Sequence, residues 1–153
     1  MNPSTNLEEA ILFATYAHQG QKHATGTPYI LHPLRVMNRV WAEGGNEEQM
    51  IIAVLHDTIE DTKATFDDIH RVAGLSVACS VNLLTRGAAS CYEEYIGCIA
   101  VHEGIVGSNA RLVKLADLAD NLELGRTHPL TKARQFKLTS RYLKAQTYLR
   151  GVK

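Results

Sequence analysis

Hydrophobic residues recur every three to four positions along almost the whole chain, which is the spacing of amphipathic α-helices. No segment shows a convincing alternation with a period of two, so we expect no strands. The sequence therefore predicts an all-α helical bundle in which residues 1–153 form a single domain. The predicted helices cover about residues 7–18, 32–43, 47–60, 65–73, 76–84, 92–103, 110–124 and 132–149.

Local signals support several of these boundaries. Asn6 or Thr5 can cap the first helix, Pro33 suits the first turn of the second, and Gly44-Gly45 stops it. Thr65-Phe-Asp-Asp68 resembles a capping box. Trp41 and the other apolar residues at helical spacing are expected in the core.

Composition narrows the class of protein. Hydrophobic residues make up 45% and charged residues 21% of the 153 positions, as in ordinary globular proteins. The formal net charge is zero, so no overall basic field favours a nucleic acid polymer. The three cysteines form no CxxC motif, which favours a reducing compartment. With no signal peptide or transmembrane run, we expect a cytoplasmic protein without a membrane partner; the oligomeric state stays open.

The most informative segment follows the apolar run Met50–Leu55, which reads His56-Asp57-Thr-Ile-Glu60-Asp61. Burying such a polar cluster costs several kcal/mol unless something compensates it, and a metal ion would. His56 and Glu60, like Asp57 and Asp61, are four residues apart and share a helical strip. The alternative reading is a solvated helix end.

Two further residues make a metal site the better interpretation. His32 precedes Pro33, and alone it would read as a capping or core histidine. Asp117 lies between Ala116 and Leu118 in an apolar helix, and aspartate is rarely buried without a partner. Two histidines and two aspartates would give mixed nitrogen and oxygen ligation of a borderline to hard divalent cation.

Together these motifs resemble the HD-domain hydrolases of the RelA/SpoT type, especially the small stand-alone alarmone hydrolases. The matching stretches occur in the family's order over about residues 7–125. They are His18-Gln-Gly-Gln21, Gly26-Thr-Pro-Tyr-Ile-Leu-His-Pro33, Leu55-His-Asp-Thr-Ile-Glu-Asp-Thr62 and Leu112-Val-Lys-Leu-Ala-Asp-Leu-Ala-Asp-Asn-Leu122.

The resemblance implies a manganese-dependent enzyme that removes the 3′-pyrophosphate of guanosine tetra- or pentaphosphate. Ligand types alone would also admit Fe²⁺ or Zn²⁺. The implied roles are metal binding by His32, His56, Asp57 and Asp117; water activation by Glu60 and Asp61; and substrate binding by Lys22, His23, Tyr29, Asn121, Arg126, Arg134 and Tyr142.

Two departures keep other functions open. His23 and Glu123 each stand where the family tends to have arginine, and a carboxylate near phosphates would weaken anion binding. Arg126, Lys132 or Arg134 could supply the missing charge. The alternatives are an HD phosphohydrolase for another nucleotide, such as an adenosine alarmone or NADPH, and a module that binds a nucleotide without cleaving it.

Overall fold

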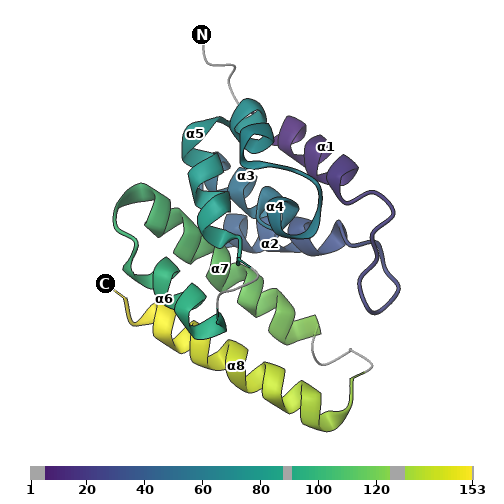
Figure 1. Cartoon of the computed structure of the whole chain (residues 1–153), viewed down its shortest axis with the longest axis vertical. Coiled ribbons are helices and arrows are strands. Elements are labelled where there is room, and N and C mark those ends of the chain that lie inside the picture. The colour runs from purple at the N-terminus through teal and green to yellow at the C-terminus, as the bar shows by residue number, and fades with distance from the viewer. Residues whose placement is uncertain (1–5, 88–90, 125–129, 153) are drawn as a thin grey trace.

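Helices account for every regular element in the part of the chain that the computed structural model describes, residues 6–87, 91–124 and 130–152 (Figure 1). The predicted all-α class is confirmed. The helices are α1 (Leu7–Ala17), α2 (Leu31–Ala42), α3 (Glu47–Leu55), α4 (Thr58–Asp61), α5 (Phe66–Leu84), α6 (Tyr92–Val101), α7 (Gly104–Leu124) and α8 (Lys132–Arg150).

Side-chain caps fix several helix starts. The Asn6 side chain accepts a hydrogen bond from Glu9 N at the start of α1. Thr65 and Asp68 form the predicted capping box of α5. Gly74 interrupts α5 with φ 81° and ψ 172°, so the two predicted helices are two segments separated by a kink.

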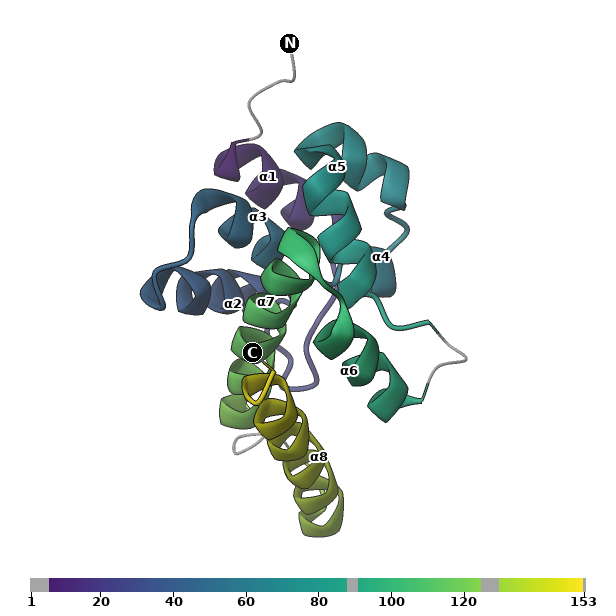
Figure 2. The same cartoon turned by 90° about the vertical axis from the view of Figure 1, so that its left-hand side faces the viewer.

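The core is built around α3. Its residues Ile51–Leu55 are all buried, and the helix contacts α1, α2, α5 and α7. Helix α7 runs from this core to the other half of the molecule, where α6 and α8 pack against it (Figure 2). None of the described helices is both long and apolar enough to cross a membrane.

The predicted continuous helix from Glu47 to Glu60 was wrong. Helix α3 ends at Leu55, and a turn at His56 and Asp57 leads into the short α4. The Thr58 hydroxyl donates to Leu55 O at 2.6 Å, and His56 Nδ1 lies 2.7 Å from Ala53 O. Such local bonds from side chain to backbone compete with the regular helical pattern. The metal motif therefore lies on a turn between two helices.

Two other predictions are corrected. Helix α7 begins at Gly104, earlier than the expected start near residue 110. Trp41 is 67% exposed and does not belong to the core. Val36 and Val40 occupy the buried face of α2, and Trp41, one residue further on, is turned by about 100° from it.

Candidate metal centre and its cavity

Four side chains from three parts of the chain converge on one point. His32 comes from α2, His56 and Asp57 from the turn after α3, and Asp117 from α7. His32 Nε2 lies 3.5 Å from Asp57 Oδ2 and 3.1 Å from Asp117 Oδ1. His56 Nε2 lies 3.1 Å and 3.7 Å from the same two atoms. The ligand atoms of His32, His56 and Asp57 all lie within 4.8 Å of one another, as a shared cation requires.

Both imidazoles aim Nε2 at this point because their Nδ1 atoms are engaged elsewhere. His32 Nδ1 lies 2.7 Å from Asp120 Oδ2, and His56 Nδ1 lies 2.7 Å from Ala53 O. Nδ1 is then the donor, and in the neutral ring Nε2 presents a lone pair. His56 Nε2 is buried without a hydrogen-bond partner. This donor set, with an unpartnered nitrogen facing two carboxylates, fits a divalent cation.

The charges of the four groups depend strongly on one another. Burial lowers the pKa of His56, but Asp57 and Asp117 outweigh it and raise that pKa to about 9. The pKa of His32 is likewise raised, again against the effect of burial. Burial would raise the pKa of Asp57, but the two histidines hold it well below the ordinary range. A cation at this point would replace the protons of the imidazoles.

Asp117 is held by two residues of its own helix. Lys114 Nζ donates to Asp117 Oδ2 at 2.7 Å, and Asn121 Nδ2 donates to Asp117 Oδ1 at 2.6 Å. Burial lowers the pKa of Lys114, but Asp117 outweighs this effect and the pKa lies well above the ordinary value. Lys114 therefore remains charged beside the site and partly neutralises its carboxylates.

Tyr29 links the candidate ligands to a second acidic group. Its hydroxyl can donate to Asp57 Oδ2 at 2.6 Å or to Asp61 Oδ2 at 2.9 Å. The buried His18 ring lies 4.9 Å from the Tyr29 ring, and His18 Nδ1 lies 2.6 Å from Gln21 Oε1. His18, from the first sequence motif, therefore packs against the ring of Tyr29.

Glu60 and Asp61 lie at the exposed side of the centre. Glu60 Oε2 accepts a hydrogen bond from Arg86 N at 2.8 Å. Partial burial and the negative charge of Asp57 raise the pKa of both carboxyl groups. A carboxylate of raised basicity next to a metal site can accept a proton from water.

His32, Asp57, Asp117, Glu60 and Asp61 line a cavity of about 240 Å³, and His56 lies outside its lining. Of the predicted substrate contacts, Tyr29, His23, Asn121 and Tyr142 line it. Lys22 and Arg134 do not. Arg126 lies outside the described residues. The cavity also has lining residues that the sequence did not single out: Leu84, Arg86, Tyr92, Tyr95, Lys114 and Arg141.

Three of these additional residues are cationic, which suits a phosphorylated ligand. Arg86 follows α5, Lys114 lies on α7 and Arg141 on α8. The Arg141 guanidinium lies 4.5 Å from the centre of the Tyr92 ring. Its place next to Tyr142 on a helix that carries no acidic residue is the signal in the sequence that could have indicated it.

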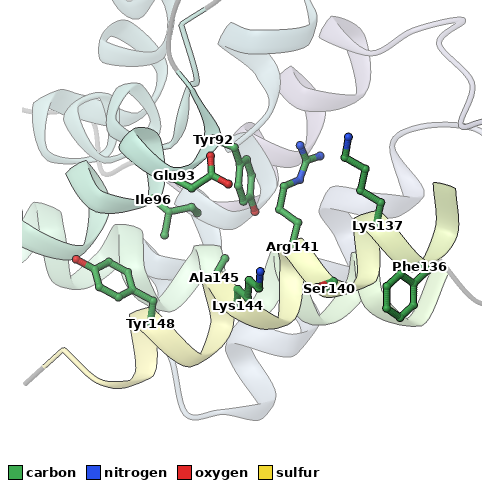
Figure 3. Close-up of a pocket in the computed structure, with 10 residues that line it drawn as sticks. All are labelled: Tyr92, Glu93, Ile96, Phe136, Lys137, Ser140, Arg141, Lys144, Ala145 and Tyr148. Carbon is green, nitrogen blue, oxygen red and sulfur yellow. The ribbon is translucent and has the colours of Figure 1, made fainter. Parts of the chain in front are cut away.

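A second cavity of about 570 Å³ adjoins the first between α6 and α8 (Figure 3). Tyr92 and Arg141 line both cavities. In Figure 3 the Arg141 side chain rises from α8 toward Tyr92, while Lys137 and Lys144 also extend from α8. Arg141 is thus a cation shared by the two cavities, and Lys137 and Lys144 add positive charge to the second.

Glu123 does not lie where the sequence suggested. It is absent from the cavity lining and pairs with Arg39 of α2. The prediction that Glu123 would lie near a bound phosphate and weaken its binding was therefore wrong. Asp120, which sequence reasoning missed, is buried beside His32 and pairs with Arg35 and Arg39.

The sequence is similar to those of several known proteins. The HD domain family matches residues 10–89. The chain is 38% identical over 128 residues to guanosine-3′,5′-bis(diphosphate) 3′-pyrophosphohydrolase MESH1 of Danio rerio, covering 80% of this chain and 71% of that protein. It is 34% identical over 125 residues to the guanosine-3′,5′-bis(diphosphate) 3′-pyrophosphohydrolase of Aquifex aeolicus, covering 76% of this chain and 17% of that protein.

A solved structure shares the whole arrangement. It is described as a metazoan orthologue of SpoT that hydrolyses ppGpp and plays a role in starvation responses. It superposes with a TM-score of 0.86 at 27% identity, covering 100% of this chain and 90% of that chain. The family match spans just over half of the chain, and the relative from Danio rerio is 38% identical. The chain therefore belongs to the HD-domain family.

Proposed function

We propose that this chain is a metal-dependent phosphohydrolase that releases pyrophosphate from the 3′ position of guanosine-3′,5′-bis(diphosphate). The observation that carries the proposal is the convergence of two imidazole Nε2 atoms and two carboxylates beside a cavity also lined by three cations. The relatives from Danio rerio and Aquifex aeolicus are named for this reaction.

His32, His56, Asp57 and Asp117 would hold the cation. We propose Mn²⁺ from the family resemblance, and the mixed donor set also suits Fe²⁺ or Zn²⁺. When bound, such a cation lowers the pKa of a water molecule and polarises a phosphoryl oxygen. The two imidazoles are already oriented for this by their Nδ1 partners, Asp120 and the Ala53 carbonyl.

Glu60 and Asp61 would position the attacking water and accept its proton. The water oxygen bonds to the phosphorus attached to the 3′ oxygen, and the bond between that phosphorus and the 3′ oxygen breaks. The 3′ oxygen takes up a proton, so the products are pyrophosphate and the nucleoside 5′-diphosphate. The hydroxyl of Tyr29 would hold Asp61 in place during the transfer.

The remaining lining residues would bind the nucleotide. Asn121 would contact the ribose, and His23 and Tyr142, which also line the cavity, would contact the base or its phosphates. Arg86 and Arg141 would neutralise phosphate charge, the role first expected of Arg126 and Arg134. His23 is a flat ring without the fixed charge of arginine, and this favours testing a second candidate, the hydrolysis of another phosphorylated nucleotide. The cytoplasmic location stays a prediction.

The decisive experiment is a hydrolysis assay of the purified chain with Mn²⁺ against a panel of guanosine and adenosine nucleotides. We expect pyrophosphate release from guanosine-3′,5′-bis(diphosphate), with kcat lowered at least about 100-fold by Glu60→Gln or Asp61→Asn. Glu93→Gln, in the neighbouring cavity, is the matched control and should retain activity. Turnover of another nucleotide alone would favour the second candidate. Tight binding without turnover of any nucleotide would favour a binding module.

A further inference from the structure

Asp120 is a buried carboxylate directly behind a candidate metal ligand. It lies on α7, three residues after Asp117, and is only 1% exposed. Its Oδ2 atom is 2.7 Å from His32 Nδ1, the ring nitrogen that faces away from the metal centre. The two aspartates therefore contact opposite nitrogens of the same imidazole.

Two arginines of α2 hold Asp120 in this position. The Arg35 guanidinium donates through Nε to Oδ1 at 2.9 Å and through Nη2 to Oδ2 at 3.1 Å, a bidentate pair. Arg39 Nε lies 3.5 Å from Asp120 Oδ1, and its Nη2 pairs with Glu123. Cations of α2 thus alternate with carboxylates of α7 along the contact between the two helices.

This network leaves the Asp120 carboxylate as a hydrogen-bond acceptor. It takes two hydrogen bonds from the Arg35 guanidinium, and its Oδ2 atom faces His32 Nδ1 at 2.7 Å. A carboxylate paired with a guanidinium accepts hydrogen bonds, so His32 Nδ1 carries a proton. When the ring is neutral, as a bound cation requires, the lone pair of His32 lies on Nε2, the atom 3.1 Å from Asp117 Oδ1.

We propose that Asp120, held by Arg35, is a positioning residue that fixes the tautomer of His32 and strengthens its bond to the metal. A carboxylate that accepts the outer N–H of a ligating histidine increases the basicity of the inner nitrogen. His56 differs because its outer nitrogen faces the neutral carbonyl of Ala53. His32 is therefore the more strongly donating histidine. The inference rests on the metal site of the proposed function and is independent of the substrate.

The test measures Mn²⁺ affinity without nucleotide, by following free Mn²⁺ with electron paramagnetic resonance during a titration. Asp120→Asn keeps the shape and an acceptor oxygen but removes the charge, and we expect it to weaken affinity about 10- to 100-fold. Arg35→Gln keeps the Asp120 carboxylate but removes its bidentate partner, and we expect a smaller loss of Mn²⁺ affinity. Glu123→Gln removes the same charge at the exposed end of the network and should stay within about twofold of the unmodified chain.

Two accompanying measurements separate positioning from general stability. The metal-free melting temperature shows whether each variant is folded. Nitrogen-15 spectra of the histidine rings, recorded without metal at a pH high enough to leave His32 neutral and with His32→Gln to assign the signal, should show His32 protonated on Nδ1 in the unmodified chain. A mixture of tautomers should appear in Asp120→Asn.

Folded Asp120→Asn with unchanged Mn²⁺ affinity would overturn the inference. So would an equal loss in Glu123→Gln, because the effect would then follow net charge alone. If Asp120→Asn does not fold, unchanged affinity in Arg35→Gln overturns it instead. Lack of hydrolysis of guanosine-3′,5′-bis(diphosphate) would contradict the proposed function and leave these affinities unaffected.

Discussion

At the scale of single residues, the site consists of buried polar groups that offset the cost of burying one another. His32, His56 and Asp117 are each less than 5% exposed, and each would be costly to bury alone. Residue type and local spacing were sufficient to predict these groups. Asp120 and Arg141 were missed because their importance depends on partners from other helices, such as the pair of His32 and Asp120, 88 positions apart. Lys114 was missed although its partner, Asp117, lies three residues away on the same helix.

The raised pKa of His56 predicts how the metal-free protein responds to pH. Between the ordinary pKa of 6.5 and the folded value of about 9, the folded chain binds a proton that the unfolded chain does not. The free energy of unfolding should therefore fall as pH rises through this window, and His32 should add to the effect. Urea unfolding in the presence of a chelator measures this.

Metal binding should depend on pH in the same pH window. Because an ion must displace the imidazole protons, Mn²⁺ affinity should rise as the stability of the metal-free chain falls. His56→Gln should make the free energy of unfolding and the Mn²⁺ affinity less dependent on pH. His70→Gln, at an exposed histidine, should leave both pH dependences unchanged. Metal-free stability that increases between pH 6.5 and 9 would contradict this account of the site.

Tyr29 gives a second prediction at this scale. Tyr29→Phe removes the hydroxyl shared by Asp57 and Asp61 but keeps the ring beside His18. We expect kcat for pyrophosphate release to fall about 10- to 100-fold because the proton acceptor is less well held, with KM changed less than about threefold. Tyr16→Phe, at a 74% exposed tyrosine, is the control. Unchanged kcat in Tyr29→Phe would show that the hydroxyl has no part in the reaction.

At the scale of elements, hydrophobic periodicity predicted every long helix, and capping residues predicted the starts of α1 and α5. The break after Leu55 could not be predicted, because no glycine or proline marks it and side-chain bonds from His56 and Thr58 end the helix. Hydrophobic periodicity also missed the first turn and a half of α7. Gly107 in this segment lies so close to His102 O that an added Cβ would be 1.8 Å from it.

Gly74 provides the stability test at this scale. Its φ of 81° and ψ of 172° lie in a region that is almost exclusive to glycine. Gly74→Ala should lower the free energy of unfolding by about 1–3 kcal/mol, although no atom would obstruct the new Cβ. Gly97→Ala, inside α6 and equally unobstructed, should instead raise it by about 0.5–1 kcal/mol. If the two substitutions changed the free energy of unfolding equally in chemical denaturation, the effect of Gly74→Ala would not come from its backbone conformation.

At the scale of the whole molecule, opposite charges are separated although the net charge is zero. Helix α8 carries six lysine or arginine residues and no acidic residue, and it borders both cavities. Composition alone concealed this asymmetry, because it averages over the chain. A cationic helix beside the cavity would draw in a polyanionic nucleotide.

The asymmetry predicts a dependence on salt. Combined Lys137→Gln and Lys144→Gln should lower kcat/KM for guanosine-3′,5′-bis(diphosphate) about tenfold at low ionic strength and little at 0.5 M salt, because salt screens exposed charges. Arg71→Gln, an exposed cation on α5 paired with Asp68, should have little effect at either ionic strength. An equal loss of kcat/KM at low and high salt would indicate that the two lysines contact the nucleotide directly and do not attract it over a long range.

The central claim is that one cation is held jointly by α2, the turn after α3 and α7. The most direct measurement is anomalous diffraction at the manganese absorption edge from crystals soaked in Mn²⁺. We predict one strong peak, about 2.0–2.3 Å from His32 Nε2, His56 Nε2 and one oxygen each of Asp57 and Asp117. A peak elsewhere, or these side chains more than about 5 Å from a common ion, would contradict the account.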